Sequence, residues 1–234
     1  MRAMNKAISI MIFGLFVNAG TPVETLVPIQ NIFSPEGFDS NDNVEVIVEG
    51  QLPNLCHKTP MKKVTIKGNT IDIKVTALSY HESNPFCPEM VVPFLETVSL
   101  GVLDKGNYKI NVNGKTVFAK DGVLTVNEST SDAVDESVYA RVDYIEKSHG
   151  SRTVKLKGYN PSDCFVLEKV EVFHNNKDVY SILPKMKQIS DFCPMKMIPF
   201  EYDVEVPKTL NKSRVLIHVR AMEGKSINTI FDNK

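Results

Sequence analysis

Apolar and polar residues alternate along most of the chain with a period of two. Val44, Val46 and Val48, for example, are interleaved with Glu45 and Glu49, and similar runs recur further on. In an extended strand this spacing buries one set of side chains and leaves the other in water. No convincing helical periodicity follows the first 20 residues. The pattern therefore predicts an all-β protein.

Turn-forming residues separate the alternating runs and set the expected strands. Asn113-Gly114 predicts a tight hairpin, because a type I′ turn needs a positive φ at both central residues. Pro93 and Pro199 lack an N–H, so each predicts an edge strand or a bulge. The expected strands are 26–33, 44–50, 61–67, 70–78, 90–100, 107–113 and 116–126 in the first half, and 138–146, 152–158, 165–173, 177–183, 196–206, 213–221 and 226–231 in the second.

Two pairs of motifs divide the chain into two equivalent units. Cys87 to Phe94 and Cys193 to Phe200 both fit Cys-Pro-x-x-apolar-apolar-Pro-Phe, whereas Gly50 to Cys56 and Gly158 to Cys164 share a Gly-x5-Cys spacing. Seven short strands with turns between them are typical of a β-sandwich. We therefore expect two tandem immunoglobulin-like β-sandwich domains, without the tryptophan or the cysteine spacing of antibody domains.

The N-terminus reads as an export signal. Arg2 and Lys6 precede an apolar run over residues 7–17, and small residues follow up to Ala19, which is the pattern of a secretory signal peptide. A membrane anchor is the alternative, but a span needs about 20 apolar residues. We therefore expect no membrane span after cleavage. The expected parts are a signal peptide at 1–19, a first domain at 20–126, a polar linker at 127–137 and a second domain at 138–234.

Four cysteines without a Cys-x-x-Cys pair indicate two disulfides in an oxidising compartment. Four cysteines allow three pairings, and the repeat favours Cys56–Cys87 and Cys164–Cys193. Each bond would close a loop of about 30 residues and stabilise its domain by roughly 3–4 kcal/mol. A zinc site would need ligands that lie closer together in the sequence.

Part of the first unit resembles a repeat in uncharacterised exported bacterial proteins. That repeat reads Gly-x-Leu-Pro-x-x-Cys, Pro-Phe, Leu-Gly-x-Leu, Gly-x-Tyr and Val-Asn-Gly. The resemblance covers residues 44–114, and the second unit keeps fewer of these elements. It implies export and a β-sandwich, and it implies no activity. The matching stretches are Gly50 to Cys56, Pro93-Phe94, Leu100 to Leu103, Gly106 to Tyr108 and Val112 to Gly114.

Composition and motifs offer little support for catalysis or for nucleic-acid binding. The formal net charge is −1, and no basic patch stands out. The five histidines lack metal-ligand spacing, and His218, between Ile217 and Val219, is expected on a solvent face. No Gly-x-Ser-x-Gly motif occurs. We assign no catalytic residue, metal site or cofactor, and we do not expect an enzyme.

Two alternative functions remain open. Met195 and Met197, with Met90, Met186 and His174 elsewhere in the chain, could serve an exported carrier of a soft metal such as copper. Methionines in strands more often fill gaps in a core. A secreted enzyme without a recognisable motif is the second alternative.

The favoured function is a secreted or periplasmic binding or structural module. Its partner would be a protein or another envelope or extracellular macromolecule, contacted through loops at the disulfide-tied ends, where ordering costs less entropy. Tyr80 and Phe86 are the kind of aromatic anchors that dominate interfaces, although Phe86 and Phe192 could instead cover the cystines. The candidate binding residues are His57, Lys58, Tyr80, His81, Glu82, Asn84, Phe86 and Lys115 in the first unit, and Lys185, Lys187, Asp191 and Phe192 in the second.

Overall fold

The computed structural model describes residues 21–84, 86–134, 137–147, 150–210 and 212–232. The expected signal peptide at 1–19 lies outside the described residues. Within them the chain forms β-strands and two short 3-10 turns, His81–Ser83 and Met222–Gly224, so the all-β prediction is confirmed. In the described ranges no helix is long and apolar enough to cross a membrane.

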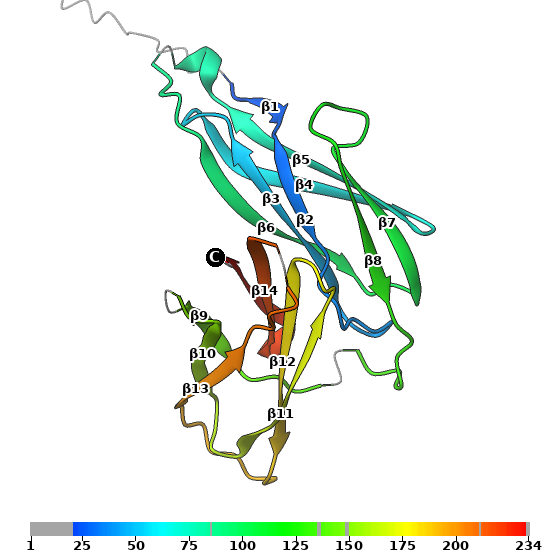
Figure 1. The fold of residues 1–234 in the computed structure, drawn as a ribbon, viewed down its shortest axis with the longest axis vertical. Helices are drawn as coiled ribbons and strands as arrows, with labels where there is room; N and C mark the ends of the chain where they lie inside the picture. The colour runs from blue at the N-terminus through cyan, green and yellow to red at the C-terminus, as the bar shows by residue number, and fades with distance from the viewer. Residues whose placement is uncertain (1–20, 85, 135–136, 148–149, 211, 233–234) are drawn as a thin grey trace, which may run out of the picture.

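The first domain is a sandwich of two sheets (Figure 1). One predicted strand, 26–33, is in fact two, because the chain crosses from one sheet to the other at Val27 and Pro28. One sheet has the order β2 (Ile29–Phe33), β3 (Val44–Leu52) and β6 (Val92–Gly101); the other joins β4 (His57–Lys67), β5 (Thr70–Ser79), β1 (Val23–Leu26), β7 (Gly106–Val112) and β8 (Lys120–Val126).

The second domain has the same order of strand pairs. In both domains one pairing is parallel, β5 with β7 in the first and β12 with β14 in the second. The sheets are β9 (Val142–Lys147), β10 (Thr153–Asn160) and β13 (Ile198–Glu205), and β11 (Phe165–His174), β12 (Val179–Gln188), β14 (Arg214–Ala221) and β15 (Lys225–Asp232).

Each domain has a hydrophobic core of its own between its sheets. Val46, Ile71 and Ile110 belong to the first core, and Leu156 and Ile182 to the second, all of them fully buried. These residues lie at the alternating apolar positions of their strands, so the period-two pattern predicted them correctly. Two separate cores fit the two tandem β-sandwich domains.

The repeated glycine motifs are explained by close contacts at Gly50 and at Gly158, each of which pairs with the phenylalanine of the second motif. Gly50 pairs with Phe94 across β3 and β6, and Gly158 pairs with Phe200 across β10 and β13. A Cβ atom on Gly50 would lie 2.3 Å from the Phe94 ring, and one on Gly158 would lie 1.9 Å from a backbone oxygen. Only glycine fits, because such distances are far inside van der Waals contact. The neighbouring prolines at 93 and 199 lie on edge strands, as predicted.

β7 and β8 form an antiparallel hairpin, as predicted, but the tight turn predicted at Asn113-Gly114 is wrong. β7 and β8 are joined by residues 113–119, and positive φ occurs at Asn113 and Lys115 rather than at Gly114. The Asn113 side chain is buried: its Oδ1 accepts from the N–H of Val75 at 2.8 Å, and its Nδ2 donates to the Val27 carbonyl at 3.1 Å. These bonds pair backbone groups where β1 gives way to β7 along β5. The asparagine therefore serves the sheet and not a tight turn.

Both predicted disulfides are present. Cys56 bonds Cys87, and Cys164 bonds Cys193, with Cα–Cα distances of 5.7 and 5.6 Å. Both values lie in the usual range for disulfides. Each bond links the connection after the second strand of its domain's first sheet to the connection before the third. Two disulfides are consistent with an oxidising environment.

Candidate functional site

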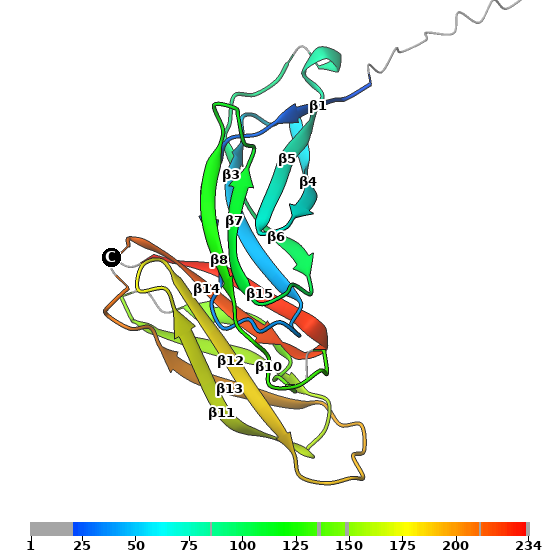
Figure 2. The ribbon, with the colours of Figure 1, turned by 90° about the vertical axis from the view of Figure 1, so that its right-hand side faces the viewer.

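The two cystine-tied ends lie at opposite ends of the molecule. We call residues 53–57, 80–84 and 86–91 tip 1, and residues 161–164 and 189–197 tip 2. Figures 1 and 2 both place tip 1 at one end of the long axis and tip 2 at the other. The domains meet near the middle, through the parts of each sandwich away from its cystine. The two tips therefore cannot form one composite site within a single chain.

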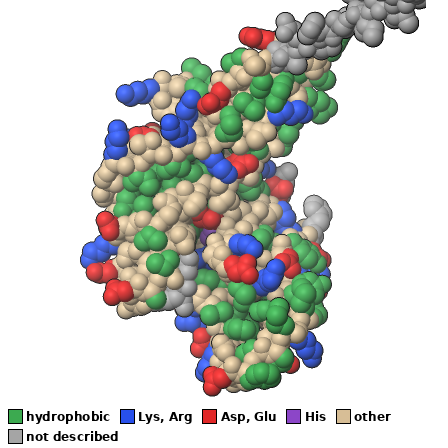
Figure 3. Space-filling model, turned by 180° about the vertical axis from the view of Figure 1, so that it is seen from behind, with side chains coloured by type: hydrophobic (Ala, Val, Ile, Leu, Met, Phe, Trp, Pro, Cys, Tyr) green, Lys and Arg blue, Asp and Glu red, His purple; other side chains and the backbone are tan. Residues whose placement is uncertain are grey.

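Each tip exposes large apolar side chains. The exposed fraction is 85% for Phe86 and 83% for Phe192, so neither ring covers its cystine. On the face shown in Figure 3, hydrophobic side chains lie near both ends of the molecule and also over its middle. Apolar groups are usually buried when the fold allows it, and clusters on a surface often mark interaction sites. The exposed apolar residues are Tyr80, Phe86, Met90 and Val91 in tip 1, and Ile189, Phe192, Met195 and Met197 in tip 2.

The backbone of each tip is fixed although its side chains are exposed. The Tyr80 N–H donates to the Cys56 carbonyl at 2.9 Å, and the Ile189 N–H donates to the Cys164 carbonyl at the same distance. In tip 1 the Phe86 N–H also donates to Oδ1 of Asn84 at 3.1 Å. Together with the cystines, these bonds hold each tip close to one conformation. A partner would then meet a preordered surface.

Most of the predicted tip 1 residues lie together. His57 and Lys58 begin β4, and the residues from Tyr80 to Phe86 follow β5, so the cystine brings both segments to one end. Nδ1 of His57 lies 2.7 Å from Oδ1 of Asn54, and burial lowers the pKa of this imidazole. Among the predicted set, Lys58, Tyr80, His81, Glu82, Asn84 and Phe86 are exposed, and His57 is half-buried.

Three other predicted residues lie outside the two tips. Lys115 belongs to the connection between β7 and β8, which Figures 1 and 2 place towards the same end of the first domain as tip 1. Lys185 and Lys187 lie within β12, because this strand runs on to Gln188. Lys185 is half-buried and forms an ion pair with Glu171 at 2.8 Å. Two of the predicted residues of the second unit, Asp191 and Phe192, do lie in tip 2, and both are exposed.

The second functional region is the contact between the domains, which we call the seam. Its centre is an apolar cluster that joins Phe33 and Ile47 of the first domain to Val179 and Leu216 of the second. Ile47 lies on the outer face of β3, opposite the core residues Val46 and Val48. The sequence could show that this face carries both apolar and polar residues, but it could not show that another domain covers the face.

Charged groups surround the apolar cluster of the seam. Both terminal nitrogens of the Arg220 guanidinium donate hydrogen bonds to the Asp42 carboxylate, one of them at 2.9 Å. Only 9% of each side chain is exposed. The same guanidinium stacks over the rings of Phe38 and Tyr139, 5.3 and 4.8 Å from their centroids. Arg214 bonds the buried carboxylate of Glu49. A buried, bidentate pair of this kind is costly to break, because one partner would be left charged and unpaired.

The prediction that His218 faces solvent is wrong. Its side chain does point away from the core residues Ile217 and Val219, but the first domain covers that face, and only 1% of the residue is exposed. Nδ1 of His218 lies 2.9 Å from Oδ1 of Asn228 and 3.4 Å from a carboxylate oxygen of Glu45. Burial lowers the pKa of this imidazole. The Glu45 carboxylate and the hydrogen bond to Asn228 raise the pKa and partly oppose the effect of burial, whereas the charge of Arg220 lowers it further.

The hydrogen bonds around His218 decide which ring nitrogen carries the proton. The Asn228 amide nitrogen donates to Thr97 at 3.0 Å and to Ser226 at 3.1 Å, so its oxygen is the atom that faces His218. Nδ1 must therefore be the donor, and in the neutral ring Nε2 carries the lone pair. Nε2 is buried and has no hydrogen-bond partner among the described residues. Such an atom is uncommon, because an unpaired buried polar group costs free energy.

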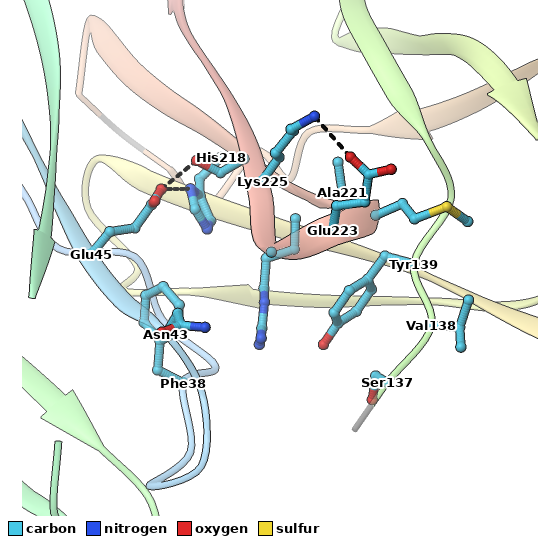
Figure 4. A pocket seen from close by; sticks show the side chains of 14 residues that line it. Phe38, Asn43, Glu45, Ser137, Val138, Tyr139, His218, Ala221, Glu223 and Lys225 are labelled. Carbon is cyan, nitrogen blue, oxygen red and sulfur yellow. Dashed lines mark hydrogen bonds and ion pairs between the residues drawn. The ribbon is translucent and has the colours of Figure 1, made fainter. Parts of the chain in front are cut away.

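A pocket of about 410 Å³ opens beside this histidine, between the domains (Figure 4). Phe38, Asn43 and Glu45 line it from the first domain, and Tyr139 and His218 are among the residues that line it from the second. Glu223 and Lys225 form an exposed ion pair at 2.9 Å in the pocket wall. The volume lies within the range of pockets that bind small ligands. Sequence reasoning missed this site because its residues come together only when the domains meet.

The residues of the copper alternative do not meet. Met186 is buried in the second domain, Met195 and Met197 are exposed at tip 2, and Met90 lies at tip 1 at the other end of the molecule. Among the described residues, no group of three or more His, Cys, Asp or Glu side chains is placed to hold a metal ion.

Comparison with known proteins gives one match. Residues 46–120 match a family model described as ORF11 beta-sandwich domain. This span lies within the first domain and includes most of the stretch that carries the motif resemblance. It supports a β-sandwich family for the first domain, and it does not establish the exported bacterial repeat. No curated protein and no solved structure matches the chain.

Proposed function

We propose that this chain is an exported two-domain binding module that contacts a macromolecular partner through tip 1 and tip 2. The observation that carries the proposal is the exposure of Phe86 and Phe192, at 85% and 83%, on loops that a cystine and backbone hydrogen bonds hold in place. Aromatic side chains on ordered loops are the usual anchors of protein interfaces. The β-sandwich with its disulfides is consistent with such a module.

The chemistry of the tips favours an apolar contact over an electrostatic one. The formal net charge is −1, and the exposed side chains that stand out are Phe86 and Met90 in tip 1 and Phe192, Met195 and Met197 in tip 2. Methionine adapts its shape to a partner, whereas phenylalanine supplies a rigid anchor. Because the seam holds the tips at opposite ends, one molecule offers two separate contact surfaces. The partner class is a protein or another envelope or extracellular macromolecule with apolar patches.

The test compares capture of the partner by matched variants. The full chain is purified as wild type, as Phe86→Ser with Phe192→Ser, and as Val117→Ser, and each is used to capture proteins from native envelope or culture fluid. Val117 is 92% exposed on the connection after β7, outside the residues that define either tip, so its variant controls for the loss of one exposed apolar residue. We expect the tip variant to lose a partner that wild type and Val117→Ser retain, with the melting temperature unchanged. Equal capture by all three would overturn the proposal.

A second variant tests the loop beside Phe86. Tyr80→Ala with His81→Ala removes an aromatic and an imidazole group from tip 1 only. We expect weaker capture together with unchanged melting. Unchanged capture by this variant, combined with loss in the phenylalanine variant, would restrict the tip 1 contact to Phe86 and its apolar neighbours.

A further inference from the structure

We propose that the seam pocket binds a small primary ammonium ion with an apolar tail, a ligand class unrelated to the partner of the tips. Two acceptors in the pocket carry this inference. One is the buried lone pair of His218 Nε2, which has no partner in the described structure. The other is the Glu45 carboxylate, which lines the same pocket. Figure 4 shows the Glu45 and His218 side chains next to each other above Phe38, and the Arg220 guanidinium lies between the Phe38 and Tyr139 rings.

The hydrogen bonds of Glu45 leave its charge without a cation. Its Oε1 atom accepts from the Ser226 hydroxyl and, at longer range, from the Asn228 amide, and it lies 3.4 Å from the donor nitrogen of His218. These groups are neutral while the imidazole is neutral. Buried or half-buried carboxylates are stabilised most by a positively charged donor. A ligand ammonium group supplies that charge.

The other charges of the pocket are already matched. Arg220 is held by Asp42, and Lys225 is held by Glu223. Among the described residues that line the pocket, Glu45 is therefore the charged side chain without an ion-pair partner while His218 is neutral, and a positive charge on a ligand would pair with it. An anionic ligand would lie against the Glu45 carboxylate, while the two cations of the pocket already have acidic partners. An uncharged ligand could donate hydrogen bonds but would leave Glu45 uncompensated.

An ammonium group also matches the hydrogen-bonding needs of the site. It carries three N–H donors and no acceptor, and the two open positions are both acceptors. Phe38, Val138, Tyr139, Ala221 and Met222 are among the residues that line the pocket, and they provide apolar surface for a hydrocarbon tail. Nε2 of His218 is closed to solvent in the present arrangement. The donor therefore reaches it with a small shift of the imidazole or of the Phe38 ring.

The test uses three probes with the same tail and different ends: phenethylammonium, 2-phenylethanol and phenylacetate. Each is titrated into the full chain near neutral pH, and the imidazole ¹⁵N resonances of His218 are followed together with the dissociation constant. We expect the ammonium probe to bind about tenfold more tightly than the alcohol, as a charge-assisted hydrogen bond implies. We expect no saturable binding of phenylacetate. The Nε2 resonance should shift with the ammonium probe as its lone pair accepts a hydrogen bond.

A carboxylate variant separates the charge from the shape of the pocket. Glu45→Gln keeps the size of the side chain and one acceptor oxygen, so we expect it to bind 2-phenylethanol like wild type and to lose the preference for ammonium. Glu201→Gln, on the outer face of β13, is the control and should keep that preference. Any of three results would overturn the proposal. The first is that the alcohol binds as tightly as the amine, and the second is that the amine leaves the Nε2 resonance of His218 unchanged. The third is that no probe binds at a concentration of about 10 mM, which is about ten times a dissociation constant of 1 mM.

Discussion

Phe33 and Phe86 belong to the same domain and have the same side chain, yet 2% of one and 85% of the other is exposed. Phe33 lies in the seam, where Val179 and Leu216 of the second domain cover it. Phe86 lies at tip 1, where nothing in the described chain covers it. The difference shows that the outer face of a strand can be covered within the chain, whereas the tips leave apolar surface uncovered in the described chain. The contrast supports a stabilising role for the contact between the domains and the proposed role of the tips in recognition.

The largest expected effect on stability comes from a substitution that breaks the seam. Arg220→Ala leaves the Asp42 carboxylate buried without its bidentate partner, so we expect the free energy of unfolding to fall by about 3–5 kcal/mol. Urea denaturation followed by circular dichroism measures the change. Lys155→Ala removes an exposed ion pair with Glu201 and is the control, whose midpoint should stay essentially that of wild type. Equal midpoints for both variants would mean that the seam does not hold the domains together.

The next effect concerns the covalent part of a tip. Replacing Cys56 and Cys87 together by alanine opens a loop of about 30 residues, and we expect a loss of roughly 3–4 kcal/mol in the unfolding free energy of the first domain. Thermal melting of the oxidised variant and wild type measures it. Non-reducing peptide mapping of wild type, which should give Cys56 linked to Cys87, confirms that the reference carries the bond. A variant as stable as wild type would show that tip 1 is fixed by its hydrogen bonds alone.

A smaller effect follows from the titration of the seam. Burial holds the pKa of His218 below its unfolded value of about 6.5, so the unfolded chain binds more protons as the solution becomes acidic. The contribution to stability is therefore complete above about pH 6.5 and is lost as pH falls through the lowered folded pKa. Glu45 opposes this loss, and Arg220 adds to it. His218→Gln should flatten the dependence of the urea midpoint on pH, and an unchanged slope would contradict the assignment.

The smallest expected effect on stability belongs to the tips. Phe86→Ser and Phe192→Ser change exposed side chains, so each should alter the unfolding free energy by less than about 0.5 kcal/mol. Differential scanning calorimetry of the single variants measures this. A loss of 2 kcal/mol or more, on the order seen for buried phenylalanines, would mean that the rings pack on the cystines in solution, and the contrast between tip and seam would disappear.

The sequence carries most of the information about each domain. Alternation within a strand reflects burial on one face, so runs such as Val44 to Val48 identify strands and core residues together. The repeat gave the pairing of Cys56 with Cys87, because equivalent positions in two copies imply bonds within each copy. The motif glycines at 50 and 158 were visible as a pattern, but the close contacts that require them, with the Phe94 ring at Gly50 and with the Arg141 carbonyl at Gly158, needed the structure.

What the sequence could not supply is the contact between the domains. Alternation assigned His218 to the face opposite Ile217 correctly, but a polar residue on that face is equally compatible with water and with another domain. The pairing of Arg220 with Asp42 joins residues that are far apart in the chain, and no local pattern encodes it. Asn113 was misread for a related reason, since its partners on β1 and β5 are distant in sequence.

Site-specific photo-crosslinking tests the central claim, that the tips are the recognition surfaces, most directly. A photoreactive phenylalanine analogue is placed at position 86, 192 or 117 of the full chain, which is then irradiated in native envelope or culture fluid. The account predicts covalent adducts of defined mass from positions 86 and 192 and none from position 117, although Val117 is the most exposed of the three residues. Adducts from position 117 alone, or equal adducts from all three positions, would contradict it.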